Sequence, residues 1–328
     1  MDRATMGTAL DAPIDDFLAH GRMLGRGYVP EEYILRGIRH FLLQVGASDL
    51  GRAVFDRWCE HLKGISANTR RHRQQVVLRF CLHRRRTDPT CFVPDPLYFA
   101  KPQPYRQPVL VEPEQIAQML ACAAALRPTP NSPLRSQVLR LAIVLLYTAG
   151  LRRGELLRLT LADIDEQASV VRVCESKFHK SRFVPLSSSA QQELCRYLRA
   201  RRAVCDDKRP DAPLLCNRSR GWRAYTGTGL SNGLGEVFDR AGVRDGARRR
   251  PCIHDLRHSF AVQALTGFYR RGEEVQSRLP HLALYMGHVS IASTAYYLHF
   301  IPTLAGLASE RLAQQCGHVI EEVPDDPA

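Results

Sequence analysis

Apolar residues recur every three to four positions through the first 86 residues of the chain, and no segment there alternates as a strand would. This helical period predicts four α-helices, the last of which is rich in arginine. The predicted helices cover residues 14–24, 31–46, 51–64 and 66–86. The beginning of the chain is therefore expected to fold as a four-helix unit.

A proline-rich stretch follows the fourth predicted helix. Residues 88–115 hold seven of the twenty prolines in the chain. Because proline lacks a backbone N–H and restricts the residue before it, this stretch is expected to be a linker rather than a regular element. We therefore predict a helical domain over 1–98, a linker over 99–111 and a second domain over 112–317. The remaining residues, 318–328, are acidic and contain proline, which predicts a disordered tail.

Both helical and strand periods occur after the linker. The segments with a helical period are 111–126, 132–159, 229–241, 254–271, 280–287, 290–300 and 303–315. Alternating β-branched residues predict strands at 169–176 and 181–187, joined by a hairpin turn at 177–180, and 211–219 is a further candidate strand. The expected fold class is mostly α with a small antiparallel β-sheet, an α+β second domain that follows an all-helical first one.

Positive charge is the compositional feature that bears most on function. The formal net charge is +13 and the pI is about 9.5, which points to a polyanionic partner, most often nucleic acid. From Lys63 to Arg86 there are eight Lys or Arg residues and no acid, so the fourth helix is expected to contact DNA phosphates. The arginines predicted to make these contacts are Arg70, Arg71, Arg73, Arg79 and Arg84.

Other classes of protein fit the composition less well. No run of about 18 apolar residues occurs, which argues against a membrane span. The first residues carry acids where a signal peptide needs an apolar segment, so a cytoplasmic, nucleoid-associated bacterial protein is expected. The ten cysteines lie at least ten residues apart, which excludes CxxC and zinc-ribbon spacings. Buried free thiols and no metal site are predicted.

Four short motifs carry side chains that suit chemistry on a phosphodiester. They are "AGLRRGELLRL" with Arg152, "SKFHKSRFVP" with Lys177, "HDLRH" with His254 and Arg257, and "GHVSIASTAYY" with His288 and two tyrosines. Planar guanidinium groups can bind the non-bridging oxygens of a phosphate bidentately. A lysine can release a proton to a leaving oxygen, which an arginine cannot do. Together the motifs indicate a phosphodiester site that uses no metal.

In this order, the four motifs resemble those of the tyrosine recombinases, also called phage-type integrases, over essentially the whole chain. The family pattern TGLR-x-x-E-L is matched by "TAGLRRGEL", K-x-x-K-x-R-x-V-P-L by "KFHKSRFVPL", and HxLRH by "HDLRH". Helical periodicity does not choose between Tyr296 and Tyr297, but the family spacing from the histidine of "MGHVSIASTAYY" selects Tyr297. The resemblance implies the catalytic residues Arg152, Lys177, His254, Arg257, His288 and Tyr297.

The resemblance also implies a mechanism. Tyr297 would attack a DNA phosphate held by the two arginines and His288, giving a 3′-phosphotyrosine and a free 5′-hydroxyl. Lys177 would protonate the leaving oxygen, and His254 would help with proton transfer at Tyr297. The 5′-hydroxyl of a partner strand would then reverse the step. Because the bond energy stays in the covalent intermediate, no cofactor is expected.

The resemblance further implies partners and a domain plan. The partner is double-stranded DNA with a specific recombination site, bound by a homo-tetramer on two duplexes or by an assembly with related recombinases. The first domain would be a SAM-like core-binding domain. The 31 residues from Arg257 to His288 exceed those of compact members and resemble transposon-borne recombinases. Integration, excision and transposition are all compatible with the sequence.

Several charged residues near the motifs are expected to have roles outside the chemistry. Glu155 is expected to be a structural partner within the Arg152 turn, and His258 a core or capping histidine. Contacts with the DNA backbone are predicted for Lys180, Arg182, Arg248, Arg249 and Arg250.

Three alternative functions follow from the same residues. "HDLRH" places His254 and His258 at i and i+4, close to the zinc-binding H-E-x-x-H, although Asp255 stands where a metal hydrolase needs glutamate. A type IB topoisomerase would share the tyrosine chemistry but would relax supercoils as a monomer. A DNA-binding relative without catalysis is the third alternative.

Overall fold

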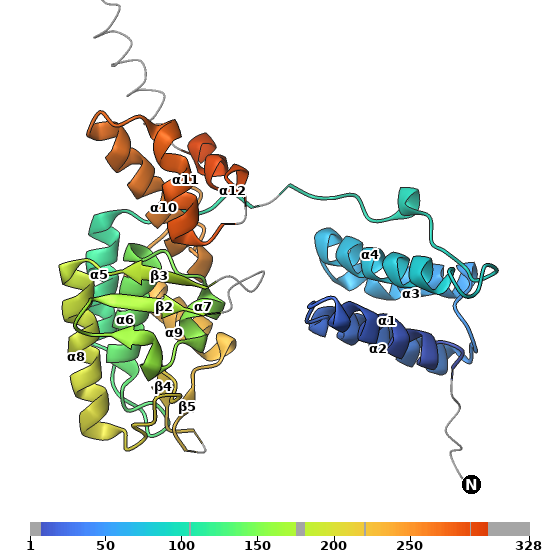
Figure 1. Ribbon diagram of the computed structural model, residues 1–328, viewed down its shortest axis with the longest axis horizontal. Helices are drawn as coiled ribbons and strands as arrows, with labels where there is room; N and C mark the ends of the chain where they lie inside the picture. The colour runs from blue at the N-terminus through green and yellow to red at the C-terminus, as the bar shows by residue number, and fades with distance from the viewer. Residues whose placement is uncertain (1–7, 105, 175–180, 220, 289, 301–328) are drawn as a thin grey trace, which may run out of the picture. The chain divides into compact units, whose positions relative to one another are not determined.

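The computed structural model describes residues 8–104, 106–174, 181–219, 221–288 and 290–300 (Figure 1). The chain forms two compact units, Met1–Arg106 and Gln107–Ala328. Three of the predictions above lie outside the described residues: the two hairpin lysines Lys177 and Lys180, the helix at 303–315, and the tail.

The first unit is built from α-helices whose apolar faces meet in one core. The helices are α1 (Asp11–Met23), α2 (Val29–Val45), α3 (Arg52–His61) and α4 (Ala67–Arg84), with 3-10 turns η1 (Leu62–Gly64) and η2 (Pro96–Tyr98). Ser66 caps α4, because its Oγ accepts a hydrogen bond from the backbone N–H of Thr69. Ile38 of α2 and Val77 and Phe80 of α4 have no exposed surface. Burial of each such side chain contributes about 1.5–3 kcal/mol.

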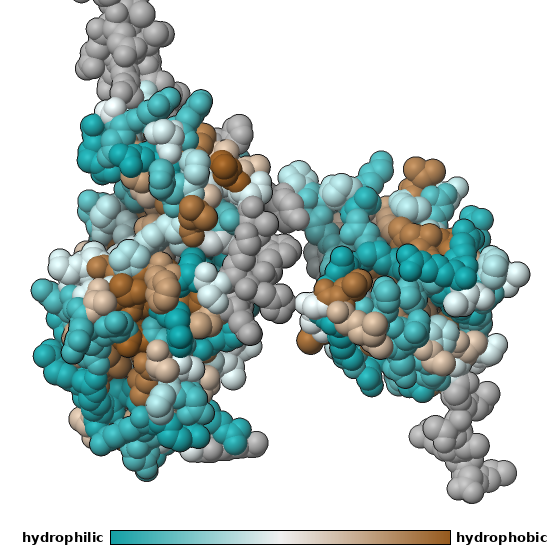
Figure 2. All heavy atoms as spheres, viewed as in Figure 1, coloured by the Kyte–Doolittle hydropathy of each residue, from teal (hydrophilic) through white to brown (hydrophobic). Residues whose placement is uncertain are grey.

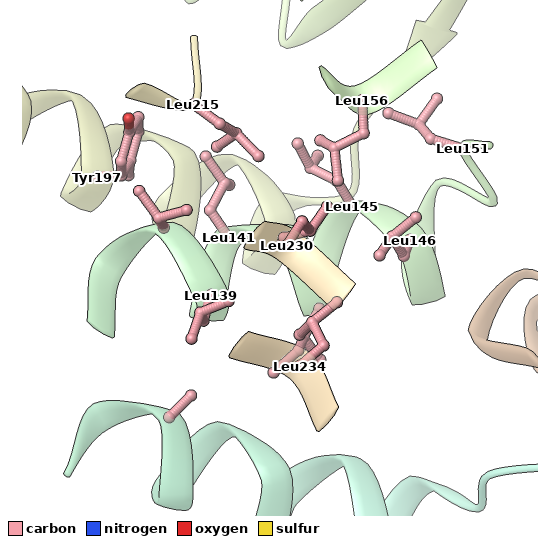
Figure 3. Close-up of a cluster of buried hydrophobic side chains, with 14 of the residues drawn as sticks. Leu139, Leu141, Leu145, Leu146, Leu151, Leu156, Tyr197, Leu215, Leu230 and Leu234 are labelled. Atoms are coloured by element: carbon pink, nitrogen blue, oxygen red, sulfur yellow. The ribbon is translucent and has the colours of Figure 1, made fainter. Parts of the chain in front are cut away.

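The second unit is also mostly helical. Its helices are α5 (Pro113–Ala124), α6 (Arg135–Thr148), α7 (Arg153–Arg158), α8 (Ser188–Val204), α9 (Gly227–Arg240), α10 (Ile253–Arg270), α11 (Val275–Met286) and α12 (Ala292–Ala295), with 3-10 turns η3 (Leu161–Asp163) and η4 (Tyr296–Phe300). Figure 3 shows leucines of α6 and α9 pointing toward one another, with Tyr197 of α8 beside them. Helix α6 is apolar on most sides because α5, α8, α9 and α10 all pack against it.

Two small antiparallel sheets complete the second unit. Strands β1 (Ile164–Asp165), β2 (Val170–Val173) and β3 (Arg182–Pro185) form one sheet, in that order, and β4 (Cys216–Asn217) pairs with β5 (Arg223–Ala224). Val171 pairs with Val184 and both are buried, whereas Phe183 on the other face of β3 is exposed. This alternation is the period-2 pattern read from the sequence. The expectation of a mostly helical chain with a small antiparallel sheet is confirmed.

Helix α8 lies where the sequence patterns predict no element. Leu194, Tyr197 and Leu198 form its buried face, and Ser187 caps its start by accepting from the backbone N–H of Ala190. Four arginines in the same seventeen residues dilute the apolar stripe, so the helical period is hard to read from the sequence alone.

The helix predicted over 132–159 is interrupted at a glycine. Helix α6 ends at Thr148, and Gly150 has φ = +59°, a left-handed conformation that favours glycine. A Cβ at Gly150 would lie 2.5 Å from the ring of Phe260 on α10, so a side chain there has no room. The chain restarts as α7, which places Arg152 at the N-cap rather than inside a long helix.

Figure 2 shows that hydrophilic residues cover most of the visible surface of each unit, with smaller hydrophobic patches between them. Within the described residues, no helix is long and apolar enough to cross a membrane. The nine cysteines in the described part of the chain are all free, but Cys174 and Cys252 are exposed, so the prediction of buried thiols is wrong at these two positions. Cys174 follows β2 and Cys252 precedes α10, so both lie at the ends of elements and not within a buried face.

Candidate active site

The turn between α6 and α7 positions the first arginine of the site. The backbone N–H of Arg152 donates to Oε2 of Glu155 (2.9 Å), and Nη1 of Arg152 donates to Oε1 of the same carboxylate (2.6 Å). Nη2 of Arg152 donates to the carbonyl oxygen of Gly287 at the end of α11 (2.7 Å). The side chain of Arg152 is half-buried, with 24% of its surface exposed. The expected role of Glu155 as a partner of this arginine agrees with these contacts.

Glu155 also accepts from a second arginine. Nη1 and Nη2 of Arg182, on β3, donate to the two oxygens of Glu155 (3.1 and 2.9 Å), and Nε of Arg182 donates to the carbonyl oxygen of Tyr285 (2.8 Å). Burial raises the pKa of the Glu155 carboxyl, but the hydrogen bonds and charges of Arg182 and Arg152 outweigh burial and hold this pKa at about 2. Glu155 is therefore ionised and fixes two guanidinium groups in place.

Arg257 of α10 lies deepest in the site, with 1% of its side chain exposed. Its Nη1 donates to the carbonyl oxygen of Gly150, and its Nη2 donates to that of Met286 (2.7 Å). Its Nη1 is also 3.9 Å from Oε2 of Glu155. Burial, together with the positive charge of Arg152, lowers the pKa of Arg257 to about 10, so the group stays charged at neutral pH. One side chain thus joins α10 to the α6–α7 turn and to the end of α11.

Gly287 brings these elements together at the end of α11. It has φ = +68°, and a Cβ there would lie 2.7 Å from Nη1 of Arg182. Only glycine allows both the left-handed turn and this close approach. Beyond the turn, Nδ1 of His288 is hydrogen-bonded to Oγ1 of Thr294 (2.7 Å). Burial lowers the pKa of His288 to about 3, with the charges of Arg257 and Arg152 adding to the effect, so the imidazole is neutral.

The two adjacent tyrosines have different environments. Tyr297 is 3% exposed and packs among residues of α10 and α11, whereas Tyr296 is 40% exposed. The ring of Tyr297 stacks on that of His288, with centroids 6.1 Å apart. Burial raises the pKa of the Tyr297 phenol, and the positive charge of Arg257 partly offsets this rise. The structure thus places Tyr297, and not Tyr296, inside the cluster of candidate residues.

His258 is the member of the site that the sequence did not predict. It lies one helical turn after His254 on α10, and its Nδ1 is 3.1 Å from Oη of Tyr297. The rings of His254 and His258 meet edge to face with centroids 4.5 Å apart. His258 was expected to be a core or capping histidine; its ring is partly buried, and it also contacts the phenol oxygen. The signal that could have found it is the second histidine of "HDLRH" itself, on the same helical face as the first.

Five of the six predicted catalytic residues therefore lie together: Arg152, His254, Arg257, His288 and Tyr297. Arg152, Arg182 and Arg257 carry three positive charges against the single negative charge of Glu155, so the described cluster favours an anion. A guanidinium has five N–H donors, and Arg152, which is 24% exposed, uses two in the contacts above and so has donors for a phosphate. Arg257 is 1% exposed and hydrogen-bonds Tyr297 in addition to its two backbone acceptors, so it adds positive charge beside the phenol. The arrangement can bind a phosphodiester beside a phenol nucleophile.

The arginines that are predicted to contact DNA phosphates differ in their surroundings in the structure. Nη1 and Nη2 of Arg84 donate to Asp49 (2.6 and 2.7 Å), and Nη2 also donates to Asp88 (2.9 Å). Arg182 donates to Glu155, as described. The remaining described members of the set are at least partly exposed: Arg70, Arg71, Arg73, Arg79, Arg248, Arg249 and Arg250. Three of these arginines also form ion pairs within the protein: Arg79 with Glu31, Arg249 with Asp245 and Arg250 with Asp239.

A metal site was one of the alternatives raised by the sequence. In the parts of the chain that the structure describes, no group of three or more His, Cys, Asp or Glu side chains could hold a metal ion.

Comparison with known proteins adds independent findings. The model of the phage integrase family matches residues 110–302. The chain is 36% identical over 249 residues to the "Putative integrase/recombinase y4rE" of Sinorhizobium fredii, which covers 76% of this chain and 78% of that protein. It is 31% identical over 217 residues to the tyrosine recombinase XerD of Caulobacter vibrioides, covering 65% and 61% of the two chains.

Two solved structures share the fold. The integrase of the Tn1549 transposon, in complex with transposon right end DNA, has a TM-score of 0.62 at 18% identity and covers 92% of this chain and 98% of that chain. The XerH site-specific recombinase, bound to a palindromic difH substrate, has a TM-score of 0.61 at 17% identity and covers 85% and 78%. At these identities the similarity establishes the fold.

Proposed function

The chain belongs to the phage integrase family of tyrosine recombinases, and from this premise we propose that it is a site-specific DNA recombinase that cleaves and rejoins strands through Tyr297. The observation that carries the choice of nucleophile is the placement of the two tyrosines. Tyr297 lies among Arg257, His258 and His288, and Tyr296 is exposed. A nucleophile needs a positioned phosphate beside it, and this cluster supplies the positive charge for one.

In the proposed first step, the two arginines Arg152 and Arg257 and the ring of His288 bind the non-bridging oxygens of the scissile phosphate. Tyr297 attacks phosphorus, the bond to the 5′ oxygen breaks, and a 3′-phosphotyrosine and a 5′-hydroxyl result. Lys177 is the proposed donor of the proton to the leaving oxygen. A 5′-hydroxyl from a partner strand reverses the step in the second half of the reaction.

Glu155 and Arg182 act as positioning residues in this proposal. Glu155 is buried and ionised, and it holds the guanidinium groups of Arg152 and Arg182 through four hydrogen bonds from their side chains and backbone. Since the transition state carries more negative charge on the phosphate than the ground state, arginines that are already fixed stabilise it without a further cost of ordering.

We propose that the first unit is the core-binding domain and that it contacts the DNA backbone. The acid-free stretch from Lys63 to Arg86, which includes α4, supports this role. Recombination would require four protomers on two duplexes, or an assembly with related recombinases. A transposon-borne origin is proposed from the lengthened segment before His288 and from the structural similarity to the Tn1549 transposon integrase.

Covalent capture tests the proposed function and finds the target site. A library of random duplexes, each with a nick that lets the cleaved fragment diffuse away, is incubated with the protein, and adducts are collected under denaturing conditions. The wild type should retain duplexes that share one sequence, and Tyr297→Phe should retain none while still binding them. Relaxation of supercoiled DNA without a shared sequence would favour the topoisomerase alternative. Binding without any adduct would favour a catalytically silent relative.

A further inference from the structure

The contact between His258 and Tyr297 bears on one step of the proposed reaction, the removal of the phenol proton of Tyr297. A phenol that attacks phosphorus must lose its proton, and the burial of Tyr297 disfavours the phenolate. A base within hydrogen-bond reach of the phenol oxygen is therefore needed. Nδ1 of His258 lies 3.1 Å from Oη of Tyr297, which is within that reach.

The surroundings of His258 keep its ring neutral, which is the protonation state that a proton acceptor needs. Burial lowers the pKa of His258 to about 4, with the neighbouring His254 and Arg257 adding to the effect, so the ring is neutral in the free protein at neutral pH. A neutral imidazole has one nitrogen that can accept a proton. The ring of His254 meets that of His258 edge to face, with centroids 4.5 Å apart, and so helps to fix its orientation.

We propose that His258 is the residue that accepts the proton of Tyr297 during strand cleavage. The inference rests on the proposed function and deepens it. As the bond from Oη of Tyr297 to phosphorus forms, the phenol proton moves to Nδ1 of His258, and the bond from phosphorus to the 5′ oxygen breaks. That oxygen takes its proton from a separate donor, for which Lys177 is proposed. During rejoining, the imidazolium of His258 returns its proton to the departing phenolate, and the attacking 5′-hydroxyl gives its proton back to the separate donor, so protons balance over the full reaction.

His254, which the family resemblance assigns to proton transfer at Tyr297, then has a different role. Its ring contacts the ring of His258, and of these two histidines it is His258 whose Nδ1 has a hydrogen-bond contact with Oη of Tyr297; Arg257, which also hydrogen-bonds the phenol, is a charged donor and cannot take its proton. We assign His254 to the positioning of His258. Substitution of His258 should accordingly impair the reaction of the nucleophile directly.

Two substitutions separate proton transfer from the hydrogen bond. Asparagine places Oδ1 where histidine has Nδ1, so His258→Asn can still accept the hydrogen bond of the phenol but cannot take its proton. His258→Ala removes both functions. His281→Asn, at an exposed position on α11, is the matched control. The measurement is the single-turnover rate of adduct formation at saturating full-length protein, on the nicked duplex recovered by covalent capture, with DNA affinity and thermal midpoint recorded for each variant.

The two His258 variants should bind the duplex as the wild type does and should form adduct about 100-fold more slowly or worse, the usual effect of losing a general base. The control should match the wild type. A rate for His258→Asn equal to that of the wild type would overturn the proposal, since the hydrogen bond alone would then suffice. If His258→Ala does not fold, the asparagine variant decides the question by itself.

A change of leaving group shows whether His258 acts on the attacking phenol or on the leaving 5′ oxygen. When sulfur replaces the 5′ bridging oxygen of the duplex, the leaving group departs as a thiolate and needs no proton. This substrate should restore the rate of Lys177→Ala and should leave both His258 variants slow. Restoration of the His258 variants would mean that His258 serves the leaving oxygen, which would refute the assignment. If the wild type forms no adduct at all, the proposed function fails; if it forms adduct and the His258 variants keep its rate, only this inference fails.

Discussion

Replacement of Glu155 by glutamine tests whether this carboxylate holds the site together. The side chain is 1% exposed and accepts from Arg152 and Arg182, with Arg257 at 3.9 Å. Glutamine has nearly the same shape but no charge. In the variant, the buried arginines face a neutral amide. This lowers the free energy of unfolding, because no negative charge then balances their positive charges.

The size of the effect follows from the proton affinity of Glu155. Its pKa falls from 4.5 to about 2 in the folded protein. Each tenfold change in proton affinity corresponds to about 1.4 kcal/mol, so the charged carboxylate contributes about 3 kcal/mol to the free energy of unfolding at neutral pH. Because the folded pKa is the lower one, this contribution is present above about pH 4.5 and is lost as the pH falls toward 2. The variant should melt about 6–12 °C lower than the wild type at pH 7.

Tryptophan fluorescence allows the thermal unfolding of the second unit to be measured separately from that of the first. Trp58 lies in the first unit and Trp222 in the second, so a Trp58→Phe background leaves Trp222 as the reporter. Glu166→Gln in the same unit is the matched control, since the ion pair of Glu166 with Arg202 is exposed and should contribute less than about 1 kcal/mol. A melting temperature of Glu155→Gln within 2 °C of that of the wild type at pH 7 would refute a stabilising role of the carboxylate. So would a difference in melting temperature that is as large at pH 2 as at pH 7.

Four further outcomes concern the stability of the first unit, DNA binding and the rate of adduct formation. Arg84→Gln should lower the free energy of unfolding of the first unit by about 2 kcal/mol, measured by denaturant titration, because it loses its hydrogen bonds to Asp49 and Asp88. Arg73→Gln should leave stability unchanged and reduce the slope of log Kd against log salt by about 1; an unchanged slope would remove this residue from the DNA interface. Arg182→Lys keeps the charge but loses the paired hydrogen bonds to Glu155, so adduct formation should slow about tenfold at equal DNA affinity, and a wild-type rate would count against its positioning role. A chelator should not change the rate of adduct formation, and recovery of lost activity by added zinc or magnesium would revive the metal-hydrolase alternative.

Local sequence patterns predict much of the fold because most of the elements have a clear apolar period. Helix α4 and the β2–β3 pair lie where the spacing places them. Helix α8 was missed because arginines interrupt its apolar stripe, and tertiary packing against α6 supplies the stability that the local pattern does not show. The break before α7 depends on Phe260, which is more than one hundred residues away in the sequence, so no local pattern could reveal how closely Gly150 is packed.

In the site, too, local motifs predict which residues take part, whereas the contacts between these residues depend on tertiary packing. The motifs name Arg152, Arg257 and His288 by their order and spacing. The bonds of the two arginines to the carbonyl oxygens of Gly287, Gly150 and Met286 depend on how α10 and α11 pack, which only the structure reveals. His258 belongs to a recognised motif, yet its contact with Tyr297 spans 39 residues of sequence. A histidine one turn along a helix gives no sign in the sequence that a phenol lies beside it.

The most direct test of the account is to locate the DNA on the protein. The wild-type adduct is digested with nuclease and protease, and the peptide that spans both tyrosines is fragmented in a mass spectrometer. The nucleotide remnant should lie on Tyr297, joined through a 3′-phosphate. A remnant on Tyr296, or on any residue outside this pair, would contradict this prediction.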